Sequence, residues 1–113
     1  MSPHPSVPLS APVPARALER AVAHVRAGGL LILPTDTVYG IGALASDAAG
    51  VSRLLAAKGR DRRMPPPVLV ADPAQAFDVV VRLPDAARAL IGAFWPGALT
   101  LVLDARADLD WDL

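Results

Sequence analysis

Twelve prolines divide this chain of 113 residues into short segments, and they limit the possible folds more than any other feature. Five of them lie in residues 1–14 together with three serines, a composition that resists both helix and sheet. We therefore expect residues 1–14 to form a flexible arm and residues 15–113 to form the folded part. The later prolines, at positions 34, 65–67, 73, 84 and 96, stand at the boundaries of the predicted helices and strands.

Helical spacing of apolar residues predicts four helices between these breaks. The first begins at Ala15 and stops at the Gly28-Gly29 pair, with His24 off its apolar stripe and facing solvent. A cap at Ser46 or Asp47 opens the second, which runs to Lys58. The third and fourth are expected at residues 73–80, after a cap at Asp72, and at residues 85–94.

Three short apolar runs predict strands at residues 30–33, 68–71 and 98–103, the first of them buried on both faces. The polar, glycine-bearing residues 35–42 are expected to form a loop at the end of the first strand, where open α/β sheets commonly bind ligands. The order of elements indicates an α/β layered domain. Three strands make a small sheet, since about 4 to 6 are usual, so we expect a domain cut short.

Composition and charge exclude several classes of function. The chain has no cysteine, which rules out disulfides, thiolate metal sites and cysteine nucleophiles, and its two histidines make a zinc enzyme a poor fit. Eleven basic side chains balance eleven acidic ones, so only a local cluster could hold a polyanion. No segment has the length of an apolar membrane span and no basic start precedes an apolar run, so we expect a cytoplasmic protein without a membrane partner.

The strongest local charge lies in residues 58–63, where four cations accompany one aspartate. Lys58 is the only lysine of the chain. An ammonium and several guanidinium groups suit a polyphosphate or a carboxylate. Cations at the end of a helix also complement the helix dipole while they stay in water, and the spacing alone is consistent with either interpretation.

A second candidate site follows the first predicted strand. Thr35, Asp36 and Thr37 could hydrogen-bond a small polar substrate, or they could satisfy the backbone of their own turn. Tyr39, the only tyrosine, could line a pocket or belong to the core. Neither Ser46 nor Ser52 has an evident base, so covalent catalysis is not expected.

Taken together, these motifs resemble the YrdC-type threonylcarbamoyl-AMP synthases over residues 15–103. The resemblance rests on ordered motifs: Gly28-Gly29, the nine residues from Pro34 to Gly42, Lys58-Gly59-Arg60, Pro65 with the strand after it, and residues 95–100. The segment from Pro34 to Gly42, followed about twenty residues later by Lys-x-Arg, is far more specific than any single part.

The resemblance implies a twisted mixed sheet flanked by helices, as in YrdC and DHBP synthase. It implies a nucleotidyltransferase that joins L-threonine, bicarbonate and ATP into threonylcarbamoyl-AMP and pyrophosphate, for threonylcarbamoyladenosine modification of tRNA. Mg²⁺ would accompany ATP, and no metal ligand is assigned. Implied site residues are Thr35 and Tyr39 for L-threonine, Lys58 and Arg60 for ATP, and Thr37, Arg62 and Arg63 as accessory groups. Possible further partners are tRNA or tRNA-modification proteins.

The implied chemistry agrees with the residue types present. Threonine carbamate is itself the nucleophile toward the α-phosphate, so the protein needs only to align reactants and neutralise phosphate charge. Three positions depart from the usual family pattern: Asp61 stands where proline is frequent, Met64 where a polar or basic residue is common, and Leu69 at a position that is polar in some members. Family domains are also longer, which again implies a truncated domain whose activity alone is in question.

Two other functions remain open at this stage. The same fold could use carbamoyl phosphate, as carbamoyl-transfer domains of hydrogenase maturation proteins do, although those belong to longer chains with zinc-finger segments. A non-catalytic RNA-binding module is the other alternative. Neutral net charge and only four clustered cations weigh against it, because affinity driven by phosphate contacts grows with their number.

Overall fold

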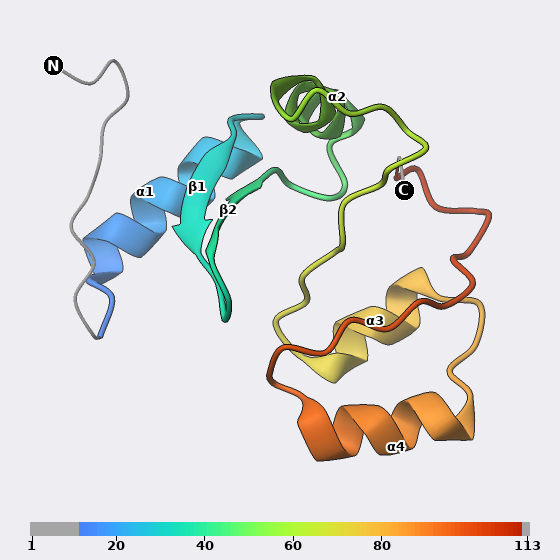
Figure 1. Cartoon of the computed structure of the whole chain (residues 1–113). Helices are drawn as coiled ribbons and strands as arrows, with labels where there is room; N and C mark the ends of the chain where they lie inside the picture. Colours follow the sequence, from blue (N-terminus) through green and yellow to red (C-terminus); the bar gives the residue numbers. More distant parts are fainter. Residues whose placement is uncertain (1–11, 112–113) are drawn as a thin grey trace, which may run out of the picture.

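The computed structural model describes residues 12–111, which form four helices and one two-stranded sheet (Figure 1). The predicted arm, residues 1–14, therefore lies largely outside the described residues. The elements in chain order are α1 (Ala15–Arg26), β1 (Leu31–Pro34), β2 (Tyr39–Gly42), α2 (Ala48–Ala57), α3 (Pro73–Val79) and α4 (Asp85–Phe94). The α/β class is confirmed, and the sheet in this part of the chain is antiparallel rather than mixed.

The hairpin of β1 and β2 corrects two sequence expectations. Residues 39–42 were expected in a loop, but they pair with β1 in a register that joins Leu31 to Gly42 and Pro34 to Tyr39. The turn at residues 35–38 reverses the chain and brings a partner strand alongside β1. The first strand is also not buried on both faces, because Ile32 is 72% exposed and the residues of β1 alternate in burial.

Two helix ends confirm the local predictions, whereas Asp47 stands at the N-cap of α2 without a capping hydrogen bond from its side chain. At the end of α1, Gly28 has a φ of +89°, its N–H bonds to Val25 O, and the Gly29 N–H bonds to His24 O. This pair of bonds is a Schellman motif, which needs a left-handed residue that glycine supplies without strain. At the start of α3, Asp72 caps the helix by accepting a 2.7 Å hydrogen bond from the Ala74 N–H.

Two predicted strands, residues 68–71 and 98–103, are absent from the structure. Both segments have no regular secondary structure, and no described strand lies beside them to pair with. The nearest sheet-like contact is one isolated antiparallel bridge between Val80 and Ala105. Strand propensity was present, but pairing is a tertiary property.

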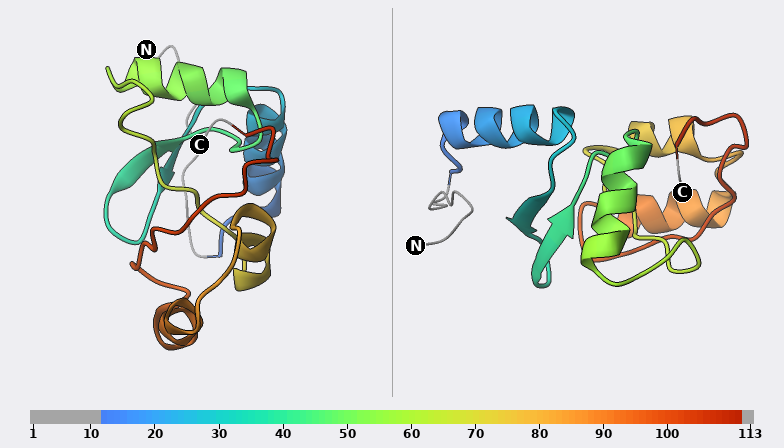
Figure 2. Two further views of the ribbon diagram at one scale, coloured as in Figure 1. Left: turned by 90° about the vertical axis from the view of Figure 1, so that its right-hand side faces the viewer. Right: turned by 90° about the horizontal axis from the view of Figure 1, so that it is seen from above.

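The best-buried side chains lie on the last three helices, and the hairpin contributes none. They are Val51, Leu54 and Leu55 of α2, Ala76 of α3, and Ala87 and Ile91 of α4. Among them the smallest exposed fraction is 4%, at Leu54. Figure 2 shows α1 and the hairpin on one side of the molecule and α3 and α4 on the other. None of the described helices is both long and apolar enough to cross a membrane.

Candidate functional site

The turn between β1 and β2 carries the first set of predicted site residues. The Thr35 hydroxyl donates a short hydrogen bond to Val38 O and accepts one of 3.3 Å from the Thr37 N–H. The two threonine hydroxyls are 3.4 Å apart. Both threonines thus serve the turn itself, as one of the two sequence interpretations expected. The same hydrogen bonds hold two hydroxyl oxygens together at the tip of the hairpin.

The side chain of Tyr39 projects into solvent rather than into the core. It is 76% exposed, and Val38 beside it is 73% exposed. Gly40 follows, and an added Cβ there would lie 3.3 Å from the Thr35 methyl group, closer than most carbon contacts. A larger residue at position 40 would therefore press on Thr35. The prediction that Tyr39 belongs to the core is therefore wrong in this structure. The alternative, that its ring lines a pocket beside the turn at residues 35–38, stays a prediction.

The Lys58-Gly59-Arg60 segment forms the end of α2. Gly59 has a φ of +63°, its N–H bonds to Ala56 O, and the Arg60 N–H bonds to Leu55 O at 2.9 Å. These are the two bonds of a Schellman motif. Lys58 is therefore the C-cap residue, and Arg60 lies two residues beyond it. The backbone at the end of α2 thus fixes the positions from which both basic side chains extend.

Asp61 organises the residues that follow. Its carboxylate accepts a 2.8 Å hydrogen bond from the Arg63 N–H and bonds of 3.1 Å and 2.6 Å from the Arg63 guanidinium. Hydrogen bonds from the Arg63 side chain, and then from its backbone, lower the pKa of Asp61, and the carboxylate raises the pKa of Arg63. The aspartate that replaces the family's frequent proline thus holds the turn closed and engages one of the four cations.

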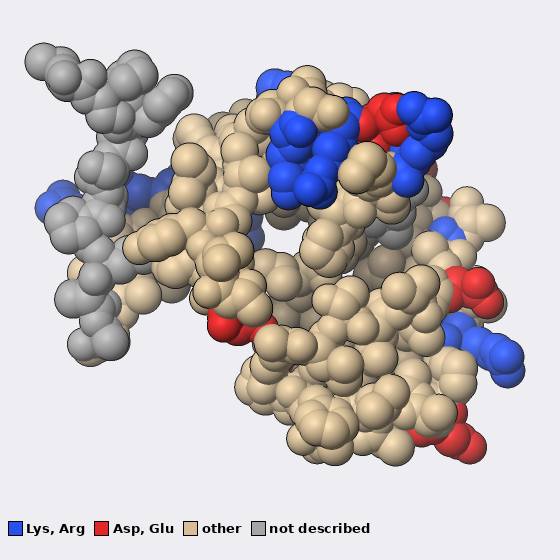
Figure 3. Space-filling view, in the orientation of Figure 1, with Lys and Arg blue, Asp and Glu red and all other residues tan. Residues whose placement is uncertain are grey.

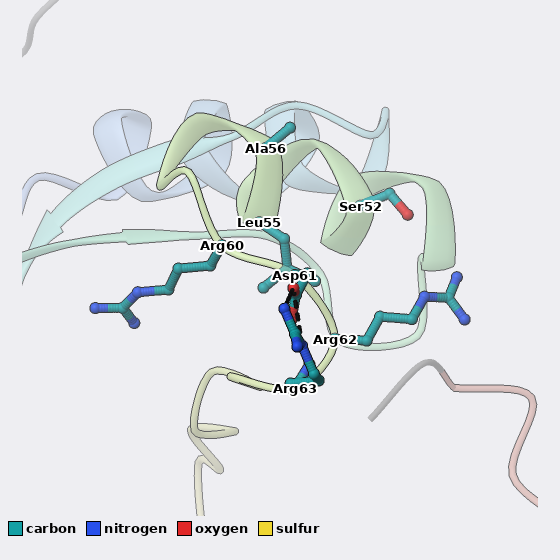
Figure 4. Close-up of a pocket in the computed structure, with 7 residues that line it drawn as sticks. All are labelled: Ser52, Leu55, Ala56, Arg60, Asp61, Arg62 and Arg63. Carbon is teal, nitrogen blue, oxygen red and sulfur yellow. Dashed lines mark hydrogen bonds and ion pairs between the residues drawn. The ribbon is translucent and has the colours of Figure 1, made fainter.

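An open hollow lies under this turn, lined by Ser52, Leu55 and Ala56 of α2 and by residues 60–63 (Figure 4). Arg60 and Arg62 extend from it in opposite directions, while Arg63 folds back onto Asp61. Figure 3 shows basic side chains gathered at this end of α2. The structure brings the predicted cations together in one patch, but their guanidinium groups do not converge on one point.

Thr35, Thr37 and Tyr39 do not line this hollow, so the two halves of the predicted site lie on separate elements. No group of three or more histidine or acidic side chains suited to a metal ion occurs within residues 12–111.

One link between these halves was missed from the sequence. The Arg53 guanidinium of α2 donates a hydrogen bond to Gly28 O, in the turn before β1, and lies 3.7 Å from an Asp47 carboxylate oxygen. An added Cβ on Gly28 would approach Arg53 Nη2 to 2.9 Å. Arg53 therefore ties the helix that ends in Lys58 to the connection that leads into the hairpin. In the sequence, the only hint of the Arg53 contact is that Arg53 lies on the predicted helix that begins after Asp47.

A second missed contact joins α1 to β1. His24 Nε2 lies 2.7 Å from Leu30 O, so the ring N–H donates a hydrogen bond to the carbonyl of the residue just before β1. The ring also fills the space above Gly29, where an added Cβ would come within 2.3 Å of it. His24 is exposed, as expected, yet it has a defined partner.

Comparison with known proteins decides the family. The family model described as "Telomere recombination", for Sua5, YciO and YrdC proteins, matches residues 23–113. This chain belongs to the Sua5/YciO/YrdC family. The family match contains both the threonine turn and the cationic turn, so the two separated halves of the site lie within one family domain.

Relatives and solved structures agree with the Sua5/YciO/YrdC assignment. A putative threonylcarbamoyl-AMP synthase of Mycobacterium leprae is 54% identical over 99 residues, which are 88% of this chain and 45% of that protein. The threonylcarbamoyl-AMP synthase of Bacillus subtilis is 40% identical over 80% of this chain and 26% of its own length. The chain thus spans less than half the length of these relatives.

Among solved structures, Pyrococcus abyssi Sua5 complexed with L-threonine matches with a TM-score of 0.82 and 36% identity. The match covers 86% of this chain and 28% of that structure. A variant of the same Sua5 gives a TM-score of 0.81 at 37% identity. The fold expected from the family resemblance is therefore confirmed over most of this chain.

Proposed function

We propose that this chain supplies the L-threonine-binding part, and the first half of the ATP-binding part, of an L-threonylcarbamoyladenylate synthase. The observation that carries the proposal is the 54% identity to a putative threonylcarbamoyl-AMP synthase over 88% of the chain. The likeness to Sua5 complexed with L-threonine supports the same substrate.

In the proposed reaction, the threonine amine attacks the carbon of bicarbonate and water leaves, which gives threonine carbamate. A carbamate oxygen then attacks the α-phosphorus of ATP, the bond from that phosphorus to the bridging oxygen breaks, and pyrophosphate leaves with the electron pair. Mg²⁺ bound with ATP would neutralise part of the phosphate charge. The protein contributes position and charge, which fits a site made of hydroxyls, an ammonium and guanidinium groups.

The residues of this chain divide the task between two elements. Thr35 and Tyr39 on the hairpin would hold L-threonine, with the Thr37 hydroxyl 3.4 Å from that of Thr35 as an accessory group. Lys58 and Arg60 at the end of α2 would hold the phosphates of ATP. Arg62 and Arg63 are accessory cations, and Arg63 would have to leave Asp61 before it could contact phosphate directly.

The product would serve threonylcarbamoyladenosine formation in tRNA, so we place the proposed activity in the cytoplasm with ATP, L-threonine and bicarbonate as substrates. Transfer RNA or tRNA-modification proteins would act downstream as partners. Neither the carbamoyl phosphate alternative nor a purely RNA-binding role is favoured by an observation in this structure.

Titration calorimetry with L-threonine tests the first half of the proposal. The unmodified chain should bind L-threonine saturably, Thr35→Ala should weaken binding at least tenfold, and Thr35→Ser, which keeps the hydroxyl, should restore most of it. Thr100→Ala is the matched control, because Thr100 is an exposed threonine outside the hairpin. Absence of saturable L-threonine binding, or equal losses in Thr35→Ala and Thr100→Ala, would overturn the assignment.

The nucleotide half is tested with Mg-ATP. Lys58→Ala and Arg60→Ala should each weaken ATP binding, because each removes a cation that would contact phosphate. Higher salt screens such exposed contacts and should therefore reduce the difference in ATP affinity between each variant and the unmodified chain. Arg82→Ala removes an exposed arginine between α3 and α4 and serves as the charge-matched control. Equal effects of the three variants would show non-specific charge attraction and contradict the proposed ATP site.

A further inference from the structure

Arg63 already has an anionic partner within the cationic turn. Its Nε lies 3.1 Å from each carboxylate oxygen of Asp61, and its Nη2 lies 2.6 Å from Oδ2. Within residues 12–111, neither Lys58 nor Arg60 forms an ion pair. Asp61 therefore occupies the hydrogen-bonding edge that Arg63 would otherwise present to an anionic ligand.

The Asp61 carboxylate takes the place on Arg63 that a phosphate group would take. A guanidinium presents its N–H groups as a planar fork, which binds two oxygens of a carboxylate or two oxygens of a phosphate. A phosphate can use this fork only after the carboxylate has left it. Because Asp61 is two residues away along the chain, it competes with a high effective concentration.

Little besides the carboxylate holds Arg63 in this position. The side chain of Arg63 is 89% exposed and that of Asp61 is 55% exposed, so packing contributes little to the pair. The turn has a backbone bond of its own, from the Met64 N–H to Asp61 O at 3.1 Å. Loss of the carboxylate charge would therefore release the Arg63 guanidinium while the turn persists.

A released Arg63 would join Arg60 at one hollow. Both residues line the open hollow under the turn. Figure 4 shows Arg63 folded onto Asp61, whereas Arg60 extends away from the turn. Two guanidinium groups at the same hollow, with Lys58 at the C-cap beside them, suit a ligand that has several negative charges.

We propose that Asp61 limits the affinity of the cationic turn for polyphosphate by holding Arg63 in an internal ion pair, which the ligand must break before Arg63 can bind it. The inference rests on the proposed ATP site and goes beyond it, because it assigns a role to a residue outside the predicted site. In the unmodified chain, binding exchanges one Arg63–oxyanion contact for another, so Arg63 adds little affinity. Once residue 61 is neutral, the phosphate contact of Arg63 is a net gain.

A double-mutant cycle on Asp61 and Arg63 tests the proposal, with inorganic tripolyphosphate as the ligand and titration calorimetry as the measurement. Asp61→Asn removes the charge and keeps a side-chain oxygen that can accept the 2.8 Å bond from the Arg63 N–H. It should tighten binding roughly threefold, the size of a well-oriented exposed ion pair, and clearly less when Arg63→Gln is also present. Simple loss of a negative charge would give the same factor in both backgrounds.

A second ion pair of the chain provides the matched control. Arg106 donates to Asp108 with distances of 2.9 Å from Nε and 2.6 Å from Nη2, and the two residues are also two positions apart. They do not line the hollow under the cationic turn. Asp108→Asn therefore removes the same charge from the same kind of pair, and it should leave the affinity for tripolyphosphate nearly unchanged.

NMR gives a direct measure of the exchange of partners. The Nε–H signal of Arg63, assigned by its loss in Arg63→Gln, should shift in Asp61→Asn at tripolyphosphate concentrations that leave it unmoved in the unmodified chain. A merely structural role of Asp61 would not produce this difference. Circular dichroism checks that each variant keeps its helices.

Three results would overturn the proposal: additive effects in the cycle, equal effects of Asp61→Asn and Asp108→Asn, or no tripolyphosphate binding by Asp61→Asn. Lys58→Ala distinguishes these failures from a failure of the proposed ATP site. Tripolyphosphate binding that Lys58→Ala leaves unchanged would contradict the ATP site, and the cycle would still decide the role of Asp61.

Discussion

Gly59 tests how the cationic turn is held. It separates Lys58 from Arg60 and has a φ of +63°, and no atom lies within 4 Å of an ideal Cβ built on it. Gly59→Ala therefore introduces conformational strain without a steric clash. A side chain in the left-handed region costs about 1–2 kcal/mol, and reduced freedom of the unfolded chain offsets about 0.4–1 kcal/mol of this. We expect a net destabilisation of about 1 kcal/mol, a change of roughly fivefold in the folding equilibrium.

Two other glycines provide matched comparisons. Gly92 lies in α4, and it too has no atom within 4 Å of an ideal Cβ, so Gly92→Ala should stabilise the chain by about 0.5–1 kcal/mol. Gly28 has a φ of +89°, and its added Cβ would lie 2.9 Å from Arg53 Nη2, so Gly28→Ala combines strain with a clash. The unfolding free energies should therefore follow the order Gly92→Ala, unmodified chain, Gly59→Ala, Gly28→Ala, from most to least stable.

Urea denaturation followed by far-ultraviolet circular dichroism measures these differences. The slope of the unfolding free energy against urea concentration should be the same in all variants, so that a shift of the unfolding midpoint reports a change in stability alone. Gly59→Asn should lose less than Gly59→Ala, because asparagine enters the left-handed region more readily. A Gly59→Ala variant as stable as the unmodified chain would show that the turn at the end of α2 is not held as described. A destabilising Gly92→Ala would contradict the open surroundings of Gly92 in α4.

Three further changes have defined outcomes. In an NMR titration the Asp61 carboxyl should have a midpoint below the ordinary value of about 3.9, because Arg63 lowers its pKa. The contribution of this pair to stability should be complete above the ordinary pKa of an aspartate and should disappear as the pH falls through the lower pKa of the folded state. Arg63→Gln should move the titration midpoint of Asp61 back up. Trp95→Phe removes an indole hydrogen bond of 2.8 Å and should cost about 1 kcal/mol in urea unfolding, while a neutral result would mean that water replaces it fully. Ile91→Ala should cost about 2–5 kcal/mol because Ile91 is 7% exposed, and Leu90→Ala, at 39% exposure, should cost clearly less; equal losses would contradict the described core.

The sequence predicted the helices and their ends well, and the reason is local. Asp72 caps α3 through a bond to a residue two positions away, and the glycines at positions 28 and 59 end their helices through bonds within the last turn. A side chain and a backbone group so close along the chain meet whatever the rest of the molecule does. Prolines act in the same local way, because they restrict only themselves and the residue before them.

The strands were predicted less well because their bonds are not local. Residues 39–42 carry two glycines in four positions, a weak strand signal, yet β1 lies beside them and they pair. Residues 98–103 have a stronger signal and remain single, because the described chain places no strand next to them. Propensity describes what a segment can do, and the available partner decides what it does.

For the candidate site, the sequence by itself determined which chemical groups are present and which predicted elements they follow: Thr35 and Tyr39 after the first predicted strand, Lys58 and Arg60 at the end of the second predicted helix. Only the structure placed Tyr39 in a strand that pairs with β1. Tertiary structure alone decided that Asp61 engages Arg63, that Arg53 reaches Gly28, and that the two halves of the site stay apart. The physical reason is distance along the chain. Capping and turn bonds form between near neighbours, whereas the mutual placement of two turns requires the packed elements between them.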